Sequence, residues 1–155
     1  MLTENESNDA FNALLNVSSK IDFFKNLSEN DIKALISDVK INKYKYGEVI
    51  FHESDSGNDN LYYLIKGKIS ISKYMQGTTS IKTMVTVIDK PSLFGEMRRF
   101  TYKPRSATVT SLDNQTLVVE FKLKDFNEAT ALAKFYRNVI CELSEKINKM
   151  NDQYC

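Results

Sequence analysis

One segment of the chain, residues 93–108, combines side chains that suit an anionic ligand. It reads Leu-Phe-Gly-Glu-Met-Arg-Arg-Phe-Thr-Tyr-Lys-Pro-Arg-Ser-Ala-Thr. Gly95 lets the backbone approach a ligand closely, and the residues after it can form a short helix whose first N–H groups favour an anion. After a stiffening proline, Arg105 can donate several hydrogen bonds to the same anion, and Ser106 adds a hydroxyl. The segment therefore predicts an anion-binding loop.

A carboxylate, Glu96, lies beside this predicted anion site. It would repel an anion, so its place makes sense only if the ligand also offers neutral donors, such as the hydroxyl groups of a sugar. A simpler interpretation is a glycine turn followed by a structural ion pair between Glu96 and Arg105. The residues alone leave both interpretations open.

The composition argues against several other classes of function. The chain has 155 residues, of which 42% are hydrophobic and 26% charged, and its net charge is +1. These values are typical of a globular protein and give no general attraction to nucleic acid or to an anionic membrane. The N-terminus is polar and acidic, and no apolar stretch is long enough to span a bilayer. We therefore expect no membrane association and no nucleic-acid partner.

The reactive side chains are few. His52 is the only histidine, so neither a catalytic triad nor a metal site can be assembled persuasively, and we expect no enzymatic activity and no metal. Cys141 and Cys155 would lie too far apart along one helix to pair. A cytoplasmic protein is the simplest interpretation. The chain stops at Cys155, soon after the last expected helix, and we expect no DNA-binding domain.

The elements that must position the anion-binding loop are mainly short strands. Alternating apolar residues and turn signals predict strands over 41–46, 49–51, 61–72 (around a turn at Gly67), 81–88, 108–112 and 116–123. Short strands at this spacing favour an all-β barrel or sandwich over a βαβ fold.

Helices are expected before and after these strands. Residues 1–10 are polar and look frayed, and the apolar residues after them hint weakly at a short helix. A clearer helix begins at Ser28, where Asp31 completes a capping-box pattern, and it runs for about three turns. Its apolar face consists of Ile32, Leu35, Ile36 and Val39. After Asp125 the pattern is helical to the end of the chain.

The C-terminal helix carries an apolar stripe at heptad spacing. The stripe predicts either a face packed on the chain's own β domain or a parallel two-helix contact between two copies. In the second case Phe135 and Val139, which lie off the stripe, could pack on the domain. The stripe consists of Ile140, Leu143, Ile147, Met150 and Tyr154.

Motifs of three kinds, in four segments of the chain, resemble those of cyclic nucleotide-binding domains. The segment from Phe94 to Ala107 resembles the family's phosphate-binding cassette, with Phe-Gly-Glu followed after seven residues by Pro-Arg-Ser-Ala. Residues 46–50 and 60–67 look like the family's earlier strand motifs, and residues 23–28 look like its N-terminal motif. The resemblance covers roughly residues 21–150.

This resemblance implies a mainly β fold with flanking helices. The expected domain is a jelly-roll-like β-roll of about eight strands, with an N-terminal helix, a short cassette helix and C-terminal helices. The implied division is a flexible or helical extension over 1–20, the β-roll over 21–130, and a C-terminal lid or dimerisation helix over 131–155.

The resemblance also implies a role for each site residue. Arg105 and Ser106 would hold the cyclic phosphate, and Glu96 would accept a hydrogen bond from the ribose 2′-hydroxyl. Apolar strand residues would face the base, and Lys146 and Ile147 would lie over it as a lid. The implied ligand-binding residues are Phe94, Gly95, Glu96, Met97, Arg98, Arg105, Ser106, Ala107, Ile71 and Val85.

Arg98 departs from the family pattern, which usually has a small residue at this position beside the phosphate. Its long cationic side chain could add a second phosphate contact, crowd the pocket or turn into solvent. The departure bears on affinity and on ligand identity rather than on the fold.

The implied function is binding rather than catalysis. We expect a sensor or regulatory module that binds cyclic AMP rather than cyclic GMP, needs no cofactor, and signals through its C-terminal helix to an unknown downstream protein. A homodimer through that helix is a further expectation. The alternative is a ligand-free protein-interaction or dimerisation module on the same fold, with a degenerate pocket.

Overall fold

Eight strands in the residues that the structure describes (4–78, 80–124 and 129–154) form two four-stranded antiparallel sheets. The structure is a computed structural model. Sheet A has the strand order β1-β8-β3-β6, and sheet B has the order β2-β7-β4-β5. This arrangement confirms the expected β-roll. The strands are β1 (Ile36–Tyr44), β2 (Val49–Phe51), β3 (Leu61–Lys66), β4 (Ile69–Tyr74), β5 (Lys82–Ile88), β6 (Ser92–Phe94), β7 (Thr108–Ser111) and β8 (Thr116–Leu123).

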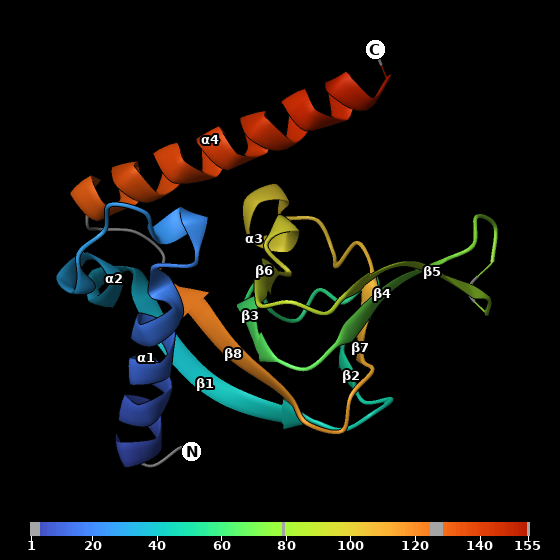
Figure 1. Cartoon of the computed structure of the whole chain (residues 1–155), viewed down its shortest axis with the longest axis horizontal. Coiled ribbons are helices and arrows are strands. Elements are labelled where there is room, and N and C mark those ends of the chain that lie inside the picture. Colours follow the sequence, from blue (N-terminus) through green and yellow to red (C-terminus); the bar gives the residue numbers. More distant parts are fainter. Residues whose placement is uncertain (1–3, 79, 125–128, 155) are drawn as a thin grey trace.

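Helices flank the sheets (Figure 1). The N-terminal helices gather at one end of the molecule, beside β1 and β8, and α4 passes over them and continues past α3. The helices are α1 (Glu4–Ser18), the 3-10 helix η1 (Asp22–Phe24), α2 (Glu29–Leu35), α3 (Met97–Thr101) and α4 (Ala129–Tyr154). Among the described residues, no helix is long and apolar enough to cross a membrane.

The N-terminal region differs from the sequence expectation in two ways. Residues 4–10 are helical rather than frayed, because α1 buries Ala10 and Leu14 against the rest of the chain. The capping box at Ser28 is confirmed, but α2 ends at Leu35. Ile36 and Val39 belong to β1, where they pair with residues of β8, so the strand ladder overrides the helical spacing that these apolar residues also satisfy.

Other differences concern short or terminal elements. Strand β6 was not expected, because three residues are too few to show a period, yet it pairs with β3 along Tyr62–Leu64. The C-terminal helices are a single continuous helix in the described range 129–154. Its expected start after Asp125 falls outside the described residues, as does Cys155.

Two apolar cores lie on the two faces of sheet A. Neighbouring residues of β3 and β8 alternate between them, because successive side chains of a strand point to opposite faces. Tyr63 and Val119 belong to the core beneath the helices, whereas Tyr62 and Val118 belong to the core between the sheets. The core between the sheets consists of Phe51, Tyr62, Leu64, Ile69, Phe94, Val109 and Val118.

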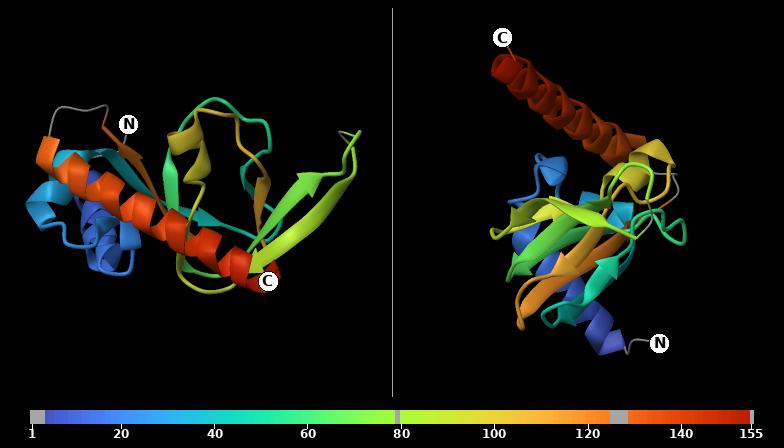
Figure 2. Two further views of the ribbon diagram at one scale, coloured as in Figure 1. Left: turned by 90° about the horizontal axis from the view of Figure 1, so that it is seen from above. Right: turned by 90° about the vertical axis from the view of Figure 1, so that its right-hand side faces the viewer.

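Helix α4 is anchored through its first half. Phe135 and Val139 are buried, as expected, and Asn138 Nδ2 donates to the carbonyl oxygens of Phe23 (3.0 Å) and Lys25 (2.7 Å). The C-terminal end of the helix stands away from the strands (Figures 1 and 2). The heptad stripe is therefore exposed at its four described side chains, and the alternative that these pack on the chain's own β domain is wrong; the side chain of Tyr154 lies outside the described ones. The exposed fractions are 64% for Ile140, 43% for Leu143, 57% for Ile147 and 58% for Met150.

A buried carboxylate organises the polar end of sheet A. Glu120, only 7% exposed, accepts hydrogen bonds from the side-chain amides of Asn42 (2.7 Å) and Asn60 (2.5 Å). The Nζ atom of Lys40 lies 3.4 Å from the same carboxylate. Burial and then the charge of Glu120 raise the pKa of Tyr62 above its usual range. Since a buried charge is tolerated only when it is paired and hydrogen-bonded, these contacts fix Asn60 in one place.

We predict that Glu120→Gln lowers the free energy of unfolding by about 1–3 kcal/mol, because one of the two asparagine amides then faces another amide N–H group. Urea unfolding at neutral pH measures the change. Glu145→Gln on the exposed part of α4 is the matched control and should stay within about 0.5 kcal/mol of the wild type. Equal stability of both variants would contradict the role given to this carboxylate.

Candidate ligand-binding site

A pocket of about 350 Å³ opens between sheet B and the segment 94–107, which we call the cassette. The volume lies within the range of small-molecule sites in proteins. The structure brings all ten expected ligand-binding residues to the pocket wall: Phe94, Gly95, Glu96, Met97, Arg98, Arg105, Ser106, Ala107, Ile71 and Val85. Their roles toward a ligand stay predictions.

Six further residues line the same pocket and were missed from the sequence. Lys73 follows Ile71 on the same face of β4, so the strand period could have identified it once Ile71 was placed. Leu93 and Thr86 are neighbours in the chain of the expected residues Phe94 and Val85, whereas the remaining three come close only through the pairing of the strands. The six are Phe51, Lys73, Thr86, Ile88, Leu93 and Val109.

The guanidinium group of Arg105 is buried beneath the cassette, with only 4% of the residue exposed. Its Nη1 atom donates to the carbonyl oxygen of Gly95 (2.6 Å), and its Nη2 atom donates to Asn58 Oδ1 (2.8 Å) and to the carbonyl oxygen of Asn60 (2.9 Å). The group also lies 4.4 Å from the ring centre of Phe51. Burial lowers the pKa of Arg105 from its usual value, but the group stays charged at neutral pH. A positive charge is thus fixed at the pocket wall.

Gly95 permits this close packing. Its φ angle is +76°, and a Cβ atom there would lie 2.8 Å from Cδ2 of Tyr62 and 3.2 Å from Nη1 of Arg105. A side chain would therefore be strained and would collide with the ring that supports the arginine. The expected close approach of the backbone at Gly95 is directed toward Arg105 as well as toward the pocket.

Glu96 lies at the junction of the pocket and α4. In the described part of the chain, Arg105 bonds to Gly95, Asn58 and Asn60 rather than to Glu96, so the interpretation as a structural Glu–Arg pair is wrong. Glu96 instead lies 3.9 Å from the Nζ atom of Lys146, which also contacts Glu142 at 2.9 Å.

The two expected lid residues differ in position. Lys146 reaches Glu96, and its side chain is about half exposed. Burial acts to lower the pKa of Lys146, but its contacts with Glu142 and then Glu96 outweigh burial and raise the pKa. Ile147 is 57% exposed and does not line the pocket. Only Lys146, therefore, is brought near the site.

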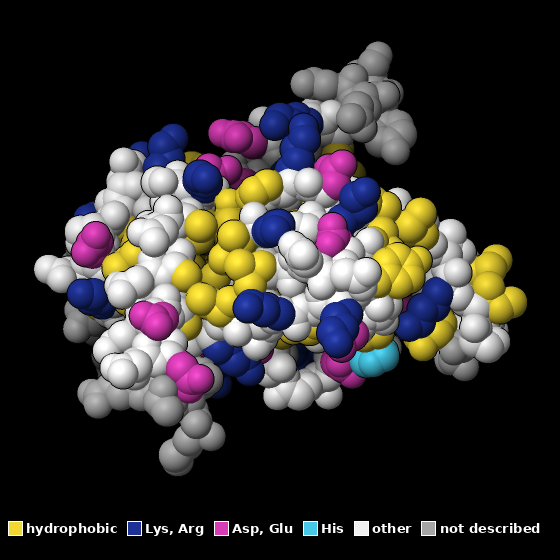
Figure 3. Space-filling model, turned by 60° about the horizontal axis from the view of Figure 1, so that its bottom comes forward, with side chains coloured by type: hydrophobic (Ala, Val, Ile, Leu, Met, Phe, Trp, Pro, Cys, Tyr) yellow, Lys and Arg dark blue, Asp and Glu magenta, His cyan; other side chains and the backbone are white. Residues whose placement is uncertain are grey.

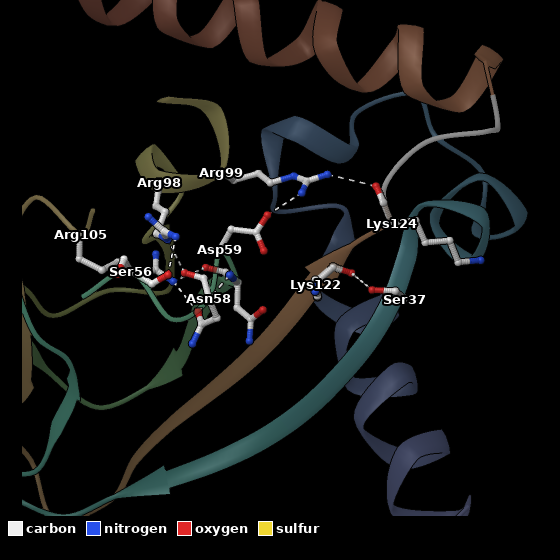
Figure 4. Close-up of polar contacts among 10 residues, drawn as sticks. Ser37, Ser56, Asn58, Asp59, Arg98, Arg99, Arg105, Lys122 and Lys124 are labelled. Carbon is white, nitrogen blue, oxygen red and sulfur yellow. Dashed lines mark hydrogen bonds and ion pairs between the residues drawn. The ribbon is translucent and has the colours of Figure 1, made fainter. Parts of the chain in front are cut away.

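Arg98 binds backbone atoms, a result that none of the three possibilities considered from the sequence describes. Its guanidinium donates to the carbonyl oxygens of Ser56 (2.6 Å) and Asn58 (2.7 Å), beside which it lies in Figure 4, and to that of Lys103 (3.1 Å). These bonds tie the loop between β2 and β3 to the cassette. The effect of Arg98 on affinity stays a prediction.

A second arginine of α3 was missed from the sequence. Arg99 is 6% exposed and donates to Asp59 Oδ2 (2.5 Å) and to the carbonyl oxygen of Lys124 (3.1 Å). Adjacent residues of a helix lie on different faces. The pair Arg98–Arg99 could therefore have indicated that one of the two side chains faces the protein. Asp59 lies in the polar segment before β3. The side chains of this segment were given no role from the sequence.

The comparisons with known proteins agree with this geometry. A profile of the cyclic nucleotide-binding domain family matches residues 41–131. The cAMP-dependent protein kinase regulatory subunit of Dictyostelium discoideum is 28% identical over 109 residues, which are 70% of this chain and 33% of that protein. The chain thus spans about a third of the length of this relative.

Solved structures share the fold at lower identity. The catabolite activator protein of Thermus thermophilus superposes with a TM-score of 0.65 at 20% identity, over 86% of this chain and 61% of that one. The regulatory domain of Toxoplasma gondii PKA, solved with cAMP, gives 0.58 at 24% identity, over 77% of this chain and 42% of that one. Since the family profile covers more than half of the residues and the expected cassette lines a pocket, the chain belongs to the cyclic nucleotide-binding domain family.

Proposed function

We propose that this chain is a regulatory sensor that binds cyclic AMP in the pocket between the cassette and sheet B. The observation that carries the proposal is the buried guanidinium of Arg105 at the wall of an otherwise largely apolar pocket. A fixed cation in a desolvated place suits a monoanionic phosphate, because charge-assisted hydrogen bonds are stronger there than in water. We propose cyclic AMP rather than cyclic GMP as the ligand because one similar protein is cAMP-dependent by name and another was solved with cAMP.

The arrangement of polar groups fits the parts of a cyclic nucleotide. The three hydrogen bonds of Arg105 use three of the five N–H donors of its guanidinium, so donors remain for a phosphate. Ser106 adds a hydroxyl on the same wall, and Glu96 would accept from the ribose 2′-hydroxyl. The base would lie against Ile71 and Val85 of sheet B.

The contact between Lys146 and Glu96 suggests how occupancy reaches α4. A ribose hydroxyl bonded to Glu96 changes the surroundings of the carboxylate that Lys146 approaches. Ligand binding thus changes the free energy of the conformation in which α4 lies against Glu96 relative to conformations in which it lies elsewhere. Such a free-energy difference is sufficient for a population shift. The output is then read by a downstream protein.

We also propose that α4 joins two copies of the chain. Its stripe is exposed and keeps heptad spacing, which suits a parallel two-helix contact. On the face shown in Figure 3, basic and acidic side chains are interspersed, and hydrophobic ones form a patch near the middle as well as smaller groups towards the end of the β4–β5 hairpin. A face without a patch of one charge sign favours protein partners over nucleic acid. We propose that the sensor acts in the cytoplasm.

We predict that Arg105→Ala weakens cyclic AMP binding by about 2–5 kcal/mol, because charge-assisted bonds to a partly buried phosphate are lost. Isothermal titration calorimetry measures the affinity, and circular dichroism checks that the variant folds. Arg137→Ala removes the same charge from the exposed surface of α4 and should bind like the wild type. Wild-type affinity in folded Arg105→Ala would overturn the proposed function.

The proposed dimer is tested by placing two carboxylates in the stripe. Leu143→Asp with Ile147→Asp should give a monomer in sedimentation at about 100 μM, where the wild type is a dimer, because burying an unpaired carboxylate is strongly unfavourable. Asn148→Asp with Lys149→Asp changes residues off the stripe and should leave the dimer intact. A monomeric wild type, with and without cyclic AMP, would rule out the dimer.

A further inference from the structure

We propose that Arg99 is a positioning residue that couples the pocket to α4, because it holds the pocket loop and the end of β8 at the same time. The pocket loop is defined here as residues 56–60, between β2 and β3. The ligand named in this inference rests on the proposed function, but the mechanical link does not. Figure 4 shows Arg99 reaching from α3 toward both Asp59 and Lys124.

Three arginines of the cassette hold the pocket loop in succession. Arg98 takes the carbonyl oxygens of Ser56 and Asn58, and Arg105 takes the side chain of Asn58 and the carbonyl oxygen of Asn60. Arg99 donates to the side chain of Asp59, the residue between Asn58 and Asn60. Since each guanidinium bonds to a different part of the loop, the loop and the cassette must move together when a ligand occupies the pocket.

The Arg99–Asp59 pair is too well buried to be a surface contact. The side chain of Arg99 is 6% exposed and that of Asp59 is 26% exposed. Burial acts to raise the pKa of Asp59, but the hydrogen bond and charge of Arg99 outweigh it, so the pKa lies below its ordinary value. Separating a desolvated guanidinium from its carboxylate is unfavourable unless another acceptor replaces it. When α3 moves, Arg99 and Asp59 therefore move together instead of separating.

The second partner of Arg99 links the loop to the C-terminal helix. Lys124 is the last described residue before α4, and its own N–H group donates to the carbonyl oxygen of Leu35 at 2.7 Å. Its carbonyl oxygen accepts from Arg99. The position of the Lys124 peptide determines where the chain leaves β8 toward α4.

The neighbouring residue of α3 reaches the same helix directly. The ring of Phe100 packs edge-on against Phe23 at 5.8 Å and lies 6.1 Å from the ring of Phe135 in α4. Displacement of α3 can therefore reach α4 by two routes: through the hydrogen bond from Arg99 to the Lys124 carbonyl oxygen at the end of β8, and through the ring contact between Phe100 and Phe135. Arg98 bonds to the loop and to Lys103 but not to β8 in the described residues, so it provides a matched comparison.

The test follows the position of α4 in the whole chain. Spin labels at Lys43→Cys and Lys149→Cys, both exposed, are placed in a background of Cys141→Ser and Cys155→Ser. Double electron–electron resonance then gives the distance between the label on β1 and the label on α4, with and without saturating cyclic AMP. In the otherwise unchanged chain, we expect cyclic AMP to shift the distance distribution.

We expect Arg99→Met to bind cyclic AMP within about threefold of the wild type, because Arg99 does not line the pocket, and to lose most of the shift. Asp59→Asn should lose it too, and serves if Arg99→Met does not fold. Arg99→Lys, which keeps the charge without the fork of donors, should retain part of the shift. Arg98→Met should bind more weakly yet show the full shift at saturation. A full shift in folded Arg99→Met, or binding to the wild type without any shift, would overturn the coupling.

A second readout separates this inference from the proposed function. If the wild type does not bind cyclic AMP, the proposed function fails, but the link is still tested by hydrogen exchange of the ligand-free protein. Arg99→Met should then speed exchange of the Lys124 amide by about tenfold or more, whereas Arg98→Met should not. Equal exchange in the two variants would overturn the link whatever the ligand.

Discussion

The need to keep a buried guanidinium hydrogen-bonded constrains the whole site. Arg105 is only 4% exposed and lies against the rings of Phe51 and Tyr62, so most of its acceptors must come from the protein itself while it still lines the pocket. They come from two directions, the Gly95 carbonyl in the cassette and the residues Asn58 and Asn60 in the pocket loop. Each of these must be held in place in turn, and much of the surrounding structure serves that purpose.

The hydrogen bonds extend from the arginine into sheet A. Asn60 is fixed by the carboxylate of Glu120, and the strand pairing of β3 with β8 brings the two together. The pocket loop is also tied to α3 by Arg98 and Arg99. A site whose charged group is already in place loses little conformational freedom when a ligand arrives, and such preorganisation favours affinity. The same rigidity is what allows a change at the pocket to be passed to the end of β8.

Local patterns in the sequence predicted the parts of the molecule that depend on neighbouring residues. The capping box at Ser28, the strands β5 and β7, and the buried Phe135 and Val139 all follow from spacing. Gly95, Glu96, Arg105 and Ser106 were placed together because their types suit one ligand, and the family resemblance added the other expected site residues. All of these expected residues line the pocket.

Features that depend on distant partners were wrong or were missed. The spacing of Ile36 and Val39 fits a helix, but both residues pair with β8, which lies far along the chain, and so belong to a strand. Glu120 looked like one polar residue in a strand, and its role appears only when Asn42 and Asn60 meet it. Arg99 was given no role, because neither Asp59 nor the Lys124 carbonyl is close to it in sequence. Side-chain burial of a charge is a tertiary property, and the sequence pattern around it carries little trace.

The central claim is that the pocket binds a cyclic phosphate, and calorimetric titration of the unmodified chain tests it most directly. Cyclic AMP and 5′-AMP are titrated in parallel at neutral pH, since the two share base and ribose but differ in the shape and charge of the phosphate. The account predicts saturable binding of one cyclic AMP per chain and binding of 5′-AMP that is weaker by about tenfold or more. No binding of cyclic AMP up to about 1 mM, or equal affinity for both nucleotides, would contradict it.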